Sequence, residues 1–376
     1  MKRFLGNIAL ILIALISAIA FGEIVVRFLY KDVSVLYPRY HTDYHYGRYT
    51  IRGNRPNTEF WHTSVDGSWK FVTNSKGFRN SKEFTYEKPA NTIRVLSLGD
   101  SHVQGHEVRQ DFTFSAVLER FLNQHGFHAE VINAGVSGFG NAEELVFLEN
   151  EGFKYKPDVV VLAFFANDFE DNVKAGLFGL DNQLNLVEQR YDHIPGVRIQ
   201  NAIYSIPSVK WLSENSYFYS LFFNNTWNYF KSKLGERAAK QVASRDKEHP
   251  TTAGGFEFAV PTSATHTEYQ VDLAATLIER MQRFCVSHGI RFIVVDIPTM
   301  PKSYKYASSL SPALRKRFEA AHIEYISSES LLHRFEGVAE IHVPHGYHHI
   351  SEFTHTLIGM EVGEKMLVSA GKAANQ

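Results

Sequence analysis

The chain has 376 residues, which is long enough for one large domain with extensions or for two domains. Its 39 basic and 40 acidic residues give a net charge of −1, so neither a basic surface for nucleic acid nor an acidic solvating tail is expected. Aromatic residues make up 14%, which argues against long disorder, and the single cysteine, Cys285, excludes an intrachain disulfide and a cysteine-based metal site.

Residues 1–30 predict a segment that enters a membrane. Lys2 and Arg3 precede an apolar run over residues 4–21, which is short for a membrane span and long for the core of a signal peptide. Because apolar residues continue beyond that run, an uncleaved anchor is favoured over a signal peptide cleaved near Ala20, which would release the mature chain. The basic pair predicts that the bulk of the chain lies on the extracytoplasmic, periplasmic side.

Residues 31–92 carry no helical period. Glycines separate short alternating stretches, which predicts a small β-rich lead-in with one or two hairpins. From residue 93 the pattern changes to alternating strands and helices. In the first half of this region the expected strands are 93–98, 129–133 and 158–165, and the expected helices are 112–124 and one that ends near 150.

Residues 169–262 interrupt this rhythm and are interpreted as an insertion. A helix is expected over 209–233 and a polar loop over 251–255. The aromatic run 217–223 is expected to pack against the body rather than to line a substrate cleft, because aromatic stripes are usually core. After the insertion the expected helices are 268–288, 311–321 and 352–370, and the expected strands are 290–297 and 323–326.

Continuous apolar strands that alternate with helices predict an α/β fold over residues 93–370, with a doubly wound, mainly parallel sheet flanked by helices. Ser101 follows the first expected strand, Gly138 the second and Asn167 the third. The carboxyl ends of such strands meet at the edge where ligands bind. Ester cleavage needs a nucleophile, a base and oxyanion donors, which a hydroxyl, an imidazole, a glycine N–H and an amide supply.

These blocks resemble the SGNH (GDSL) hydrolase superfamily, including its membrane-anchored bacterial members, over roughly residues 93–168 and 340–365. The resemblance implies a three-layer, flavodoxin-like fold. It also implies that Ser101 is the nucleophile and, through its backbone N–H, one oxyanion donor. Gly138 and Asn167 would be the other two donors.

The fourth block departs from the family pattern, which places an aspartate two or three residues before the histidine. His349 is the predicted base, but Tyr347 and Gly346 occupy those two positions. A backbone carbonyl or a phenol would then accept the Nδ1 proton in a Ser–His dyad. His348 is the rival base. The residues expected to support the site are Asp100, Asp168, Tyr347 and His348.

The fourth block is also rich in histidine, the commonest metal ligand. No H-E-x-x-H motif or carboxylate-bearing helix accompanies these side chains, so a structural or catalytic role is favoured and no metal or cofactor is predicted. The histidines concerned are His342, His345, His348, His349 and His355.

The resemblance and the predicted location together imply an anchored serine esterase that hydrolyses an acyl ester of a small molecule or a glycan. An O-acetyl ester on a bacterial envelope glycan is the favoured substrate class. One alternative is O-acyl transfer from the same Ser101-acyl intermediate to a sugar hydroxyl. The other is a catalytically impaired binding or assembly protein that keeps the fold.

Overall fold

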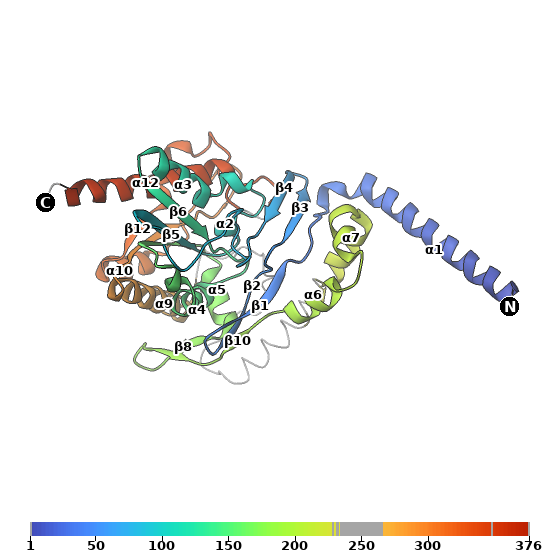
Figure 1. The fold of residues 1–376 in the computed structure, drawn as a ribbon, viewed down its shortest axis with the longest axis horizontal. Helices are drawn as coiled ribbons and strands as arrows, with labels where there is room; N and C mark the ends of the chain where they lie inside the picture. Colours follow the sequence, from blue (N-terminus) through green and yellow to red (C-terminus); the bar gives the residue numbers. More distant parts are fainter. Residues whose placement is uncertain (1, 228, 231–232, 234–265, 347–348, 375–376) are drawn as a thin grey trace. The chain divides into compact units, whose positions relative to one another are not determined.

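The computed structural model describes residues 2–227, 229–230, 233, 266–346 and 349–374 (Figure 1). The chain divides into two compact units. The first consists of residues 1–39, 60–69 and 202–256, and the second of residues 40–59, 70–201 and 257–376. The polar loop expected over residues 251–255 lies outside the described residues.

The second unit contains a five-stranded sheet in the order β12-β11-β7-β5-β6, and every neighbouring pair in it is parallel. This is the doubly wound order in which the chain reverses its winding direction between β5 and β7. The predicted parallel sheet is confirmed. Its strands are β5 (Thr92–Leu98), β6 (His128–Asn133), β7 (Val159–Phe164), β11 (Arg291–Asp296) and β12 (Glu324–Ile326).

Helices cover both faces of this sheet, as Figure 1 shows. On one face of the sheet, Val95 and the strand side chains that point the same way pack against α3 (Phe114–Gln124) and α12 (Glu352–Ala374). On the other face, Leu96 and the strand side chains that point the same way pack against α4 (Asn141–Asn150), α9 (Glu268–Ser287) and α10 (Pro312–Ala320). Burial on both faces explains why the central strand β7 is apolar throughout.

Helix α3 begins two residues later than predicted. The side chain of Thr113 accepts a hydrogen bond from the N–H of Ala116 and so caps α3, while the preceding residues form a separate 3-10 turn. The shorter helices of the second unit are α2 (Ser101–Gln104), η2 (Gln110–Phe112), η3 (Gly152–Tyr155), α5 (Asp168–Ala175), α11 (Ser328–Leu332) and η4 (His333–Phe335).

The lead-in contains the predicted hairpins. Strands β1 (His41–Tyr46) and β2 (Tyr49–Asn54) are antiparallel, and β3 (Glu59–Ser64) pairs with β4 (Gly67–Val72). The described part of the insertion also contains three short strands that were not predicted from its sequence. They are β8 (Phe178–Leu180), which is antiparallel to β9 (Leu186–Glu188), and β10 (Asp192–His193), which is parallel to β2.

The first unit contains α1 (Lys2–Leu29), η1 (Lys31–Val33), α7 (Val209–Asn215) and a further helix over residues 217–227, while α6 (Val197–Tyr204) crosses the unit boundary. The single helix expected over 209–233 is therefore wrong, because it is interrupted at Ser216. The Glu23 carboxylate accepts hydrogen bonds from the Ser216 hydroxyl and from the N–H groups of Tyr217 and Phe218. It thus caps the second helix and makes the break favourable.

Among the described residues, one helix, Arg3–Leu29, is long and apolar enough to cross a membrane. A signal sequence near the N-terminus can meet the same criteria of length and apolar composition, so this finding agrees with both predicted alternatives for residues 1–30.

Candidate active site

Ser101 is the first residue of α2, directly after the turn that ends β5. The Asp100 carboxylate caps this short helix, because its Oδ1 accepts a hydrogen bond from the N–H of His102 at 2.8 Å. Ser101 is buried, with 6% of its surface exposed. Since β5 borders the position where the sheet reverses its winding, the hydroxyl lies where open α/β sheets bind ligands.

His349 lies in the loop before α12 and contacts Ser101. Its Nε2 is 2.8 Å from Ser101 Oγ, and its Nδ1 is 2.6 Å from the carbonyl oxygen of Gly346. A carbonyl only accepts hydrogen bonds, so Nδ1 carries the proton and Nε2 is free to accept the hydroxyl proton. This is the tautomer that a general base requires.

The Gly346 carbonyl thus accepts the Nδ1 proton, which an aspartate accepts in a catalytic triad. The sequence left a backbone carbonyl and a phenol as alternatives. The same oxygen accepts the backbone N–H of His349 at 2.9 Å, so two bonds fix the ring to its own loop. Tyr347 and His348, the other predicted residues of this block, lie outside the described residues.

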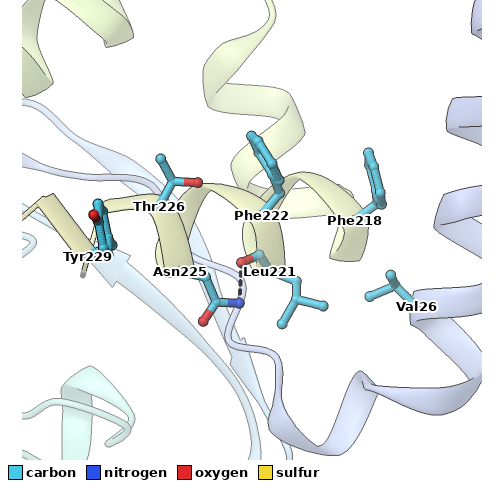
Figure 2. A pocket seen from close by; sticks show the side chains of 7 residues that line it. All are labelled: Val26, Phe218, Leu221, Phe222, Asn225, Thr226 and Tyr229. Atoms are coloured by element: carbon cyan, nitrogen blue, oxygen red, sulfur yellow. Dashed lines mark hydrogen bonds between the residues drawn. The ribbon is translucent and has the colours of Figure 1, made fainter.

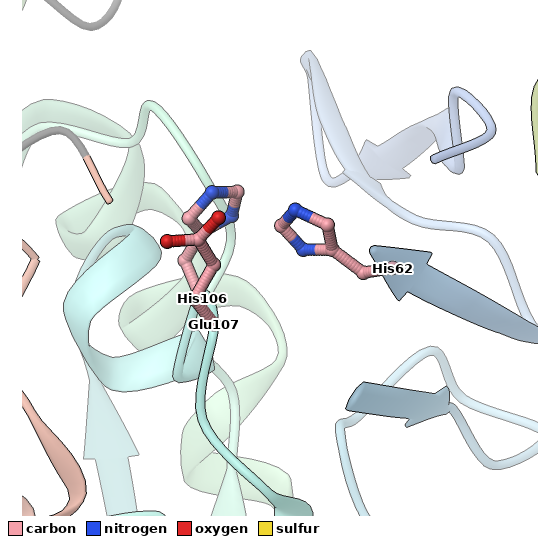
Figure 3. A group of neighbouring side chains, drawn as sticks. All are labelled: His62, His106 and Glu107. Atoms are coloured by element: carbon pink, nitrogen blue, oxygen red, sulfur yellow. The ribbon is translucent and has the colours of Figure 1, made fainter. Parts of the chain in front are cut away.

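Glu107 fills the space beside Gly346. A Cβ atom added at position 346 would collide with Oε2 of Glu107, whose side chain is buried and whose backbone has φ 57°. Figure 3 shows Glu107 with His106 on the turn after α2, and the His106 ring centroid is 4.4 Å from that of His349. His62, drawn in the same view, comes from β3 in the first unit. Sequence reasoning missed Glu107, because no local pattern links it to His349.

Two other buried histidines are neutral. Burial lowers the pKa of His102 well below its usual value, and nearby His349 lowers it further. Burial also lowers the pKa of His355 to about 3, with a contribution from the Arg79 charge, and its Nδ1 accepts the N–H of Phe114 at 3.1 Å. Neither ring therefore repels the positive charge that would develop on His349 during proton transfer.

The histidine-rich block spreads its rings over separate partners. His342 Nε2 is 2.9 Å from the carbonyl of Pro298, and a carbonyl accepts that proton. His355 accepts a backbone N–H, His349 faces Ser101, and His345 is exposed. In this block, His342 and His355 thus hold backbone groups of the fold, and His349 contacts the serine.

The two predicted oxyanion donors lie in loops with identifiable supports. Gly138 has φ 75°, and its carbonyl accepts a hydrogen bond from the buried guanidinium of Arg52. Asn167 follows β7, and its Nδ2 donates to Asp171 Oδ2 at 3.0 Å and to Asp100 Oδ2 at 3.4 Å. The Asn167 amide is thereby connected to the carboxylate that precedes Ser101. Arg52 was not predicted from the sequence.

Buried carboxyl groups lie behind these loops. One amide nitrogen, Asn141 Nδ2, donates to Glu144 Oε2 at 3.0 Å and to Asp168 Oδ2 at 3.2 Å. Burial raises the pKa values of Glu144 and Asp168 well above normal, and their proximity adds to the effect on Asp168. Asp168 was predicted as a supporting residue. Asn141 and Glu144 were not, although two adjacent glutamates opening an apolar helix are a visible signal.

Replacing Asp100 is expected to change how stability depends on pH. Burial raises the pKa of Asp100 from 3.8 to about 7, with a smaller contribution from the charge of Asp171. Between about pH 4 and pH 7 the folded chain therefore binds this proton more tightly than the unfolded chain, so the free energy of unfolding falls as the pH rises through that window. Asp100→Asn should flatten this slope in urea unfolding of the full chain.

Asp111→Asn, at an exposed aspartate, is the matched control and should keep the wild-type slope. Equal slopes for wild type and Asp100→Asn would contradict the raised pKa.

Side chains of the lead-in fix the active-site loops. Asn54 Nδ2 donates to the carbonyl of Gly135 at 2.9 Å, and Asn54 Oδ1 accepts from Gln104 Nε2 at 2.7 Å. The buried Arg79 guanidinium donates to the carbonyl oxygens of Gln104 at 2.5 Å and Val108 at 2.6 Å. The loops after β5 and β6 are thus joined through residues 54 and 79, which the sequence showed only as part of a lead-in.

No protein-family model and no curated protein matches the sequence. Among solved structures the chain is similar to the lipase/acylhydrolase from Enterococcus faecalis, at 15% identity over 73% of this chain and 95% of that chain, with a TM-score of 0.39. A structure from Desulfitobacterium hafniense, described as a lipolytic protein of the G-D-S-L family, matches at 11% identity over 72% and 98%, with a TM-score of 0.32. The acetylxylan esterase Axe2 from Geobacillus stearothermophilus matches at 10% identity over 73% and 93%, with a TM-score of 0.37.

By their descriptions these proteins are a lipase/acylhydrolase, a lipolytic protein and an esterase.

Proposed function

We propose that the chain is an SGNH-type serine esterase, anchored in a membrane by α1. The observation that carries this proposal is the 2.8 Å hydrogen bond between Ser101 Oγ and His349 Nε2 at the carboxyl edge of the parallel sheet. A hydroxyl paired with an imidazole of the correct tautomer is the minimal unit of nucleophilic acyl chemistry. It also supports an enzyme over an impaired binding protein, because the base lies in place.

In this mechanism His349 Nε2 accepts the Ser101 hydroxyl proton while Oγ attacks the ester carbonyl. The tetrahedral intermediate collapses with cleavage of the bond to the alcohol oxygen, which receives the proton from His349. Water then attacks the acyl-serine while His349 accepts its proton, and His349 returns that proton to Ser101 Oγ as the acyl–Oγ bond breaks and the free acid leaves. Bonds and protons balance over the two half-reactions without a cofactor.

The oxyanion would be held by the N–H groups of Ser101 and Gly138 and by the amide of Asn167. Asn167 Nδ2 carries two protons, and its bond to Asp100 is the longer, at 3.4 Å. The proposal requires that this N–H turn toward the substrate while the 3.0 Å bond to Asp171 holds the side chain.

Glu107 is proposed as a positioning residue for the dyad. Its carboxylate occupies the space that a side chain at position 346 would fill, three residues before His349, where the family pattern often has an aspartate. A negative charge beside Gly346 would favour the imidazolium of His349, whose Nδ1 is 2.6 Å from the Gly346 carbonyl oxygen. The missing triad acid would then come from the loop after α2.

Glu107→Gln should lower kcat roughly tenfold, because it removes the charge but keeps the shape. It should also move the acidic limb of the kcat/KM profile to lower pH, since a less stabilised imidazolium loses its proton more easily. Hydrolysis rates of a nitrophenyl ester between pH 5 and 9 measure both effects. A normal kcat with an unshifted pH profile would show that Glu107 does not assist His349, and that the Gly346 carbonyl alone holds its Nδ1 proton.

The proposed substrate is an acyl ester, with O-acetyl groups on an envelope glycan as the favoured class, because of the resemblance and the proposed extracytoplasmic location. The test is acetate release from an acetylated xylan and from a nitrophenyl acetate by the full chain. Acetate appearing only on an added sugar acceptor would instead identify an O-acyltransferase. No turnover and no labelling by a serine-directed phosphonate would favour a binding or assembly protein.

A further inference from the structure

The first unit contains an open apolar pocket of about 480 Å³ next to the end of α1. Figure 2 shows the side chains that line it, most of them on the 217–227 helix, together with Val26 of α1. The pocket is not part of the proposed active site, and the sequence did not predict it. Its lining residues are Val26, Phe218, Leu221, Phe222, Asn225, Thr226 and Tyr229.

The end of α1 is fixed against this helix. Gly22 lets the Phe218 ring approach the α1 backbone, since a Cβ there would be 3.1 Å from the ring. Arg27 donates to the carbonyl of Asn215 at 2.9 Å and lies over the Tyr217 ring at 4.8 Å. Together with the Glu23 cap, these contacts hold the aromatic face beside α1.

The 217–227 helix uses its opposite face for the protein interior. Asn224 Nδ2 donates to the carbonyl of Val35 at 3.2 Å, and the buried Ser220 donates to the carbonyl of Ser213 at 3.3 Å. On the pocket face, by contrast, Phe222 is 67% exposed and Tyr229 is 61% exposed. Large aromatic rings this open to the surroundings favour an apolar environment over water.

The length of α1 indicates that the apolar environment of these aromatic rings is a lipid bilayer. The apolar residues 4–21 form a helical segment of about 27 Å, close to the thickness of the bilayer hydrocarbon. Glu23 and Arg27 follow, and a paired carboxylate and guanidinium mark the point where the helix leaves the hydrocarbon. Residues 22–29 therefore lie in the outer interfacial zone, where aromatic side chains are favoured.

We propose that acyl chains of the bilayer that holds α1 fill this pocket, so that the aromatic face of the 217–227 helix dips into the outer leaflet. The inference rests on the proposed anchoring of α1. The helix is then an interfacial element, with its polar face toward the protein and its apolar face toward lipid. The first unit would have two points of contact with the membrane instead of one.

The test uses the full chain, in which the single cysteine, Cys285, is buried and leaves introduced thiols as the sites of labelling. Phe222→Cys is labelled with a bimane and reconstituted into phosphatidylcholine vesicles with or without bromine on the acyl chains. We expect quenching by brominated chains at least threefold stronger than for Val338→Cys, an 80% exposed control in the second unit. Equal, weak quenching at both positions would overturn the proposal.

Leu15→Cys, within α1, separates the pocket from the anchor. Strong quenching at position 15 with none at position 222 would support the membrane anchor and reject lipid in the pocket. That result is also the one expected if the pocket instead binds a protein partner, which the vesicles lack. No quenching at position 15 would reject both. Esterase activity on a water-soluble ester, measured in the same vesicles, reports separately on Ser101 and His349.

Discussion

Ser101→Ala should lower kcat/KM for ester hydrolysis by at least about a thousandfold. The hydroxyl is the side-chain group of this residue that the mechanism uses, and its oxygen is the atom 2.8 Å from His349 Nε2. Alanine fits the same helical position and removes one oxygen, so the fold should persist. The backbone N–H of residue 101 remains, which leaves one proposed oxyanion donor intact. The measurement is acetate release together with covalent labelling by a fluorescent phosphonate.

Ser97→Ala is the matched control. Ser97 is another buried serine, which lies on β5 four residues before Ser101, and its hydroxyl is not part of the proposed chemistry. It should retain activity and labelling. Residual activity of Ser101→Ala within tenfold of wild type would show that another group is the nucleophile, and full labelling of that variant would show the same directly.

His349→Ala should reduce kcat by about a thousandfold or more, because no proton acceptor would remain on Ser101 Oγ. Its effect should be nearly the same as that of Ser101→Ala, and the double variant should lose little more, since the two residues act as one unit. KM should change much less than kcat. Progress curves at saturating nitrophenyl acetate give both constants.

Two single replacements in the same loop serve as controls. His345→Ala, at an exposed position, should keep wild-type kcat. His348→Ala tests the rival register, and we expect it to retain most of the activity. Loss of activity in His348→Ala together with survival of His349→Ala would reverse the assignment of the base.

Much of the fold could be predicted because its signals are local. Strand β7 is apolar over all six of its residues, and β5 and β6 each have an apolar centre, which is the pattern of strands buried on both faces. The positions of Ser101, Gly138 and Asn167 followed, since each comes directly after such a strand. His349 needed the resemblance, because a histidine before a helix has no local signature of its own.

Other features depend on contacts between distant parts of the chain. The break at Ser216 is made by a glutamate 193 residues away, and helical periodicity within residues 209–233 gave no sign of it. Likewise, the hydrogen bonds of Arg52 and Arg79 to the active-site loops join segments that a linear pattern keeps separate.

The loop that carries His349 separates most clearly what the sequence determines from what the tertiary structure decides. The sequence by itself determined that His349 has no aspartate two or three residues before it, and that another acceptor must hold its Nδ1 proton. Only the tertiary structure decided that the acceptor is the Gly346 carbonyl and that Glu107 lies against that glycine. The physical reason is that Gly346 has no side chain, so another residue can occupy the space beside it. Which residue does so depends on how the segment after α2 packs against the loop before α12, and the spacing of residues in the sequence carries no information about that packing.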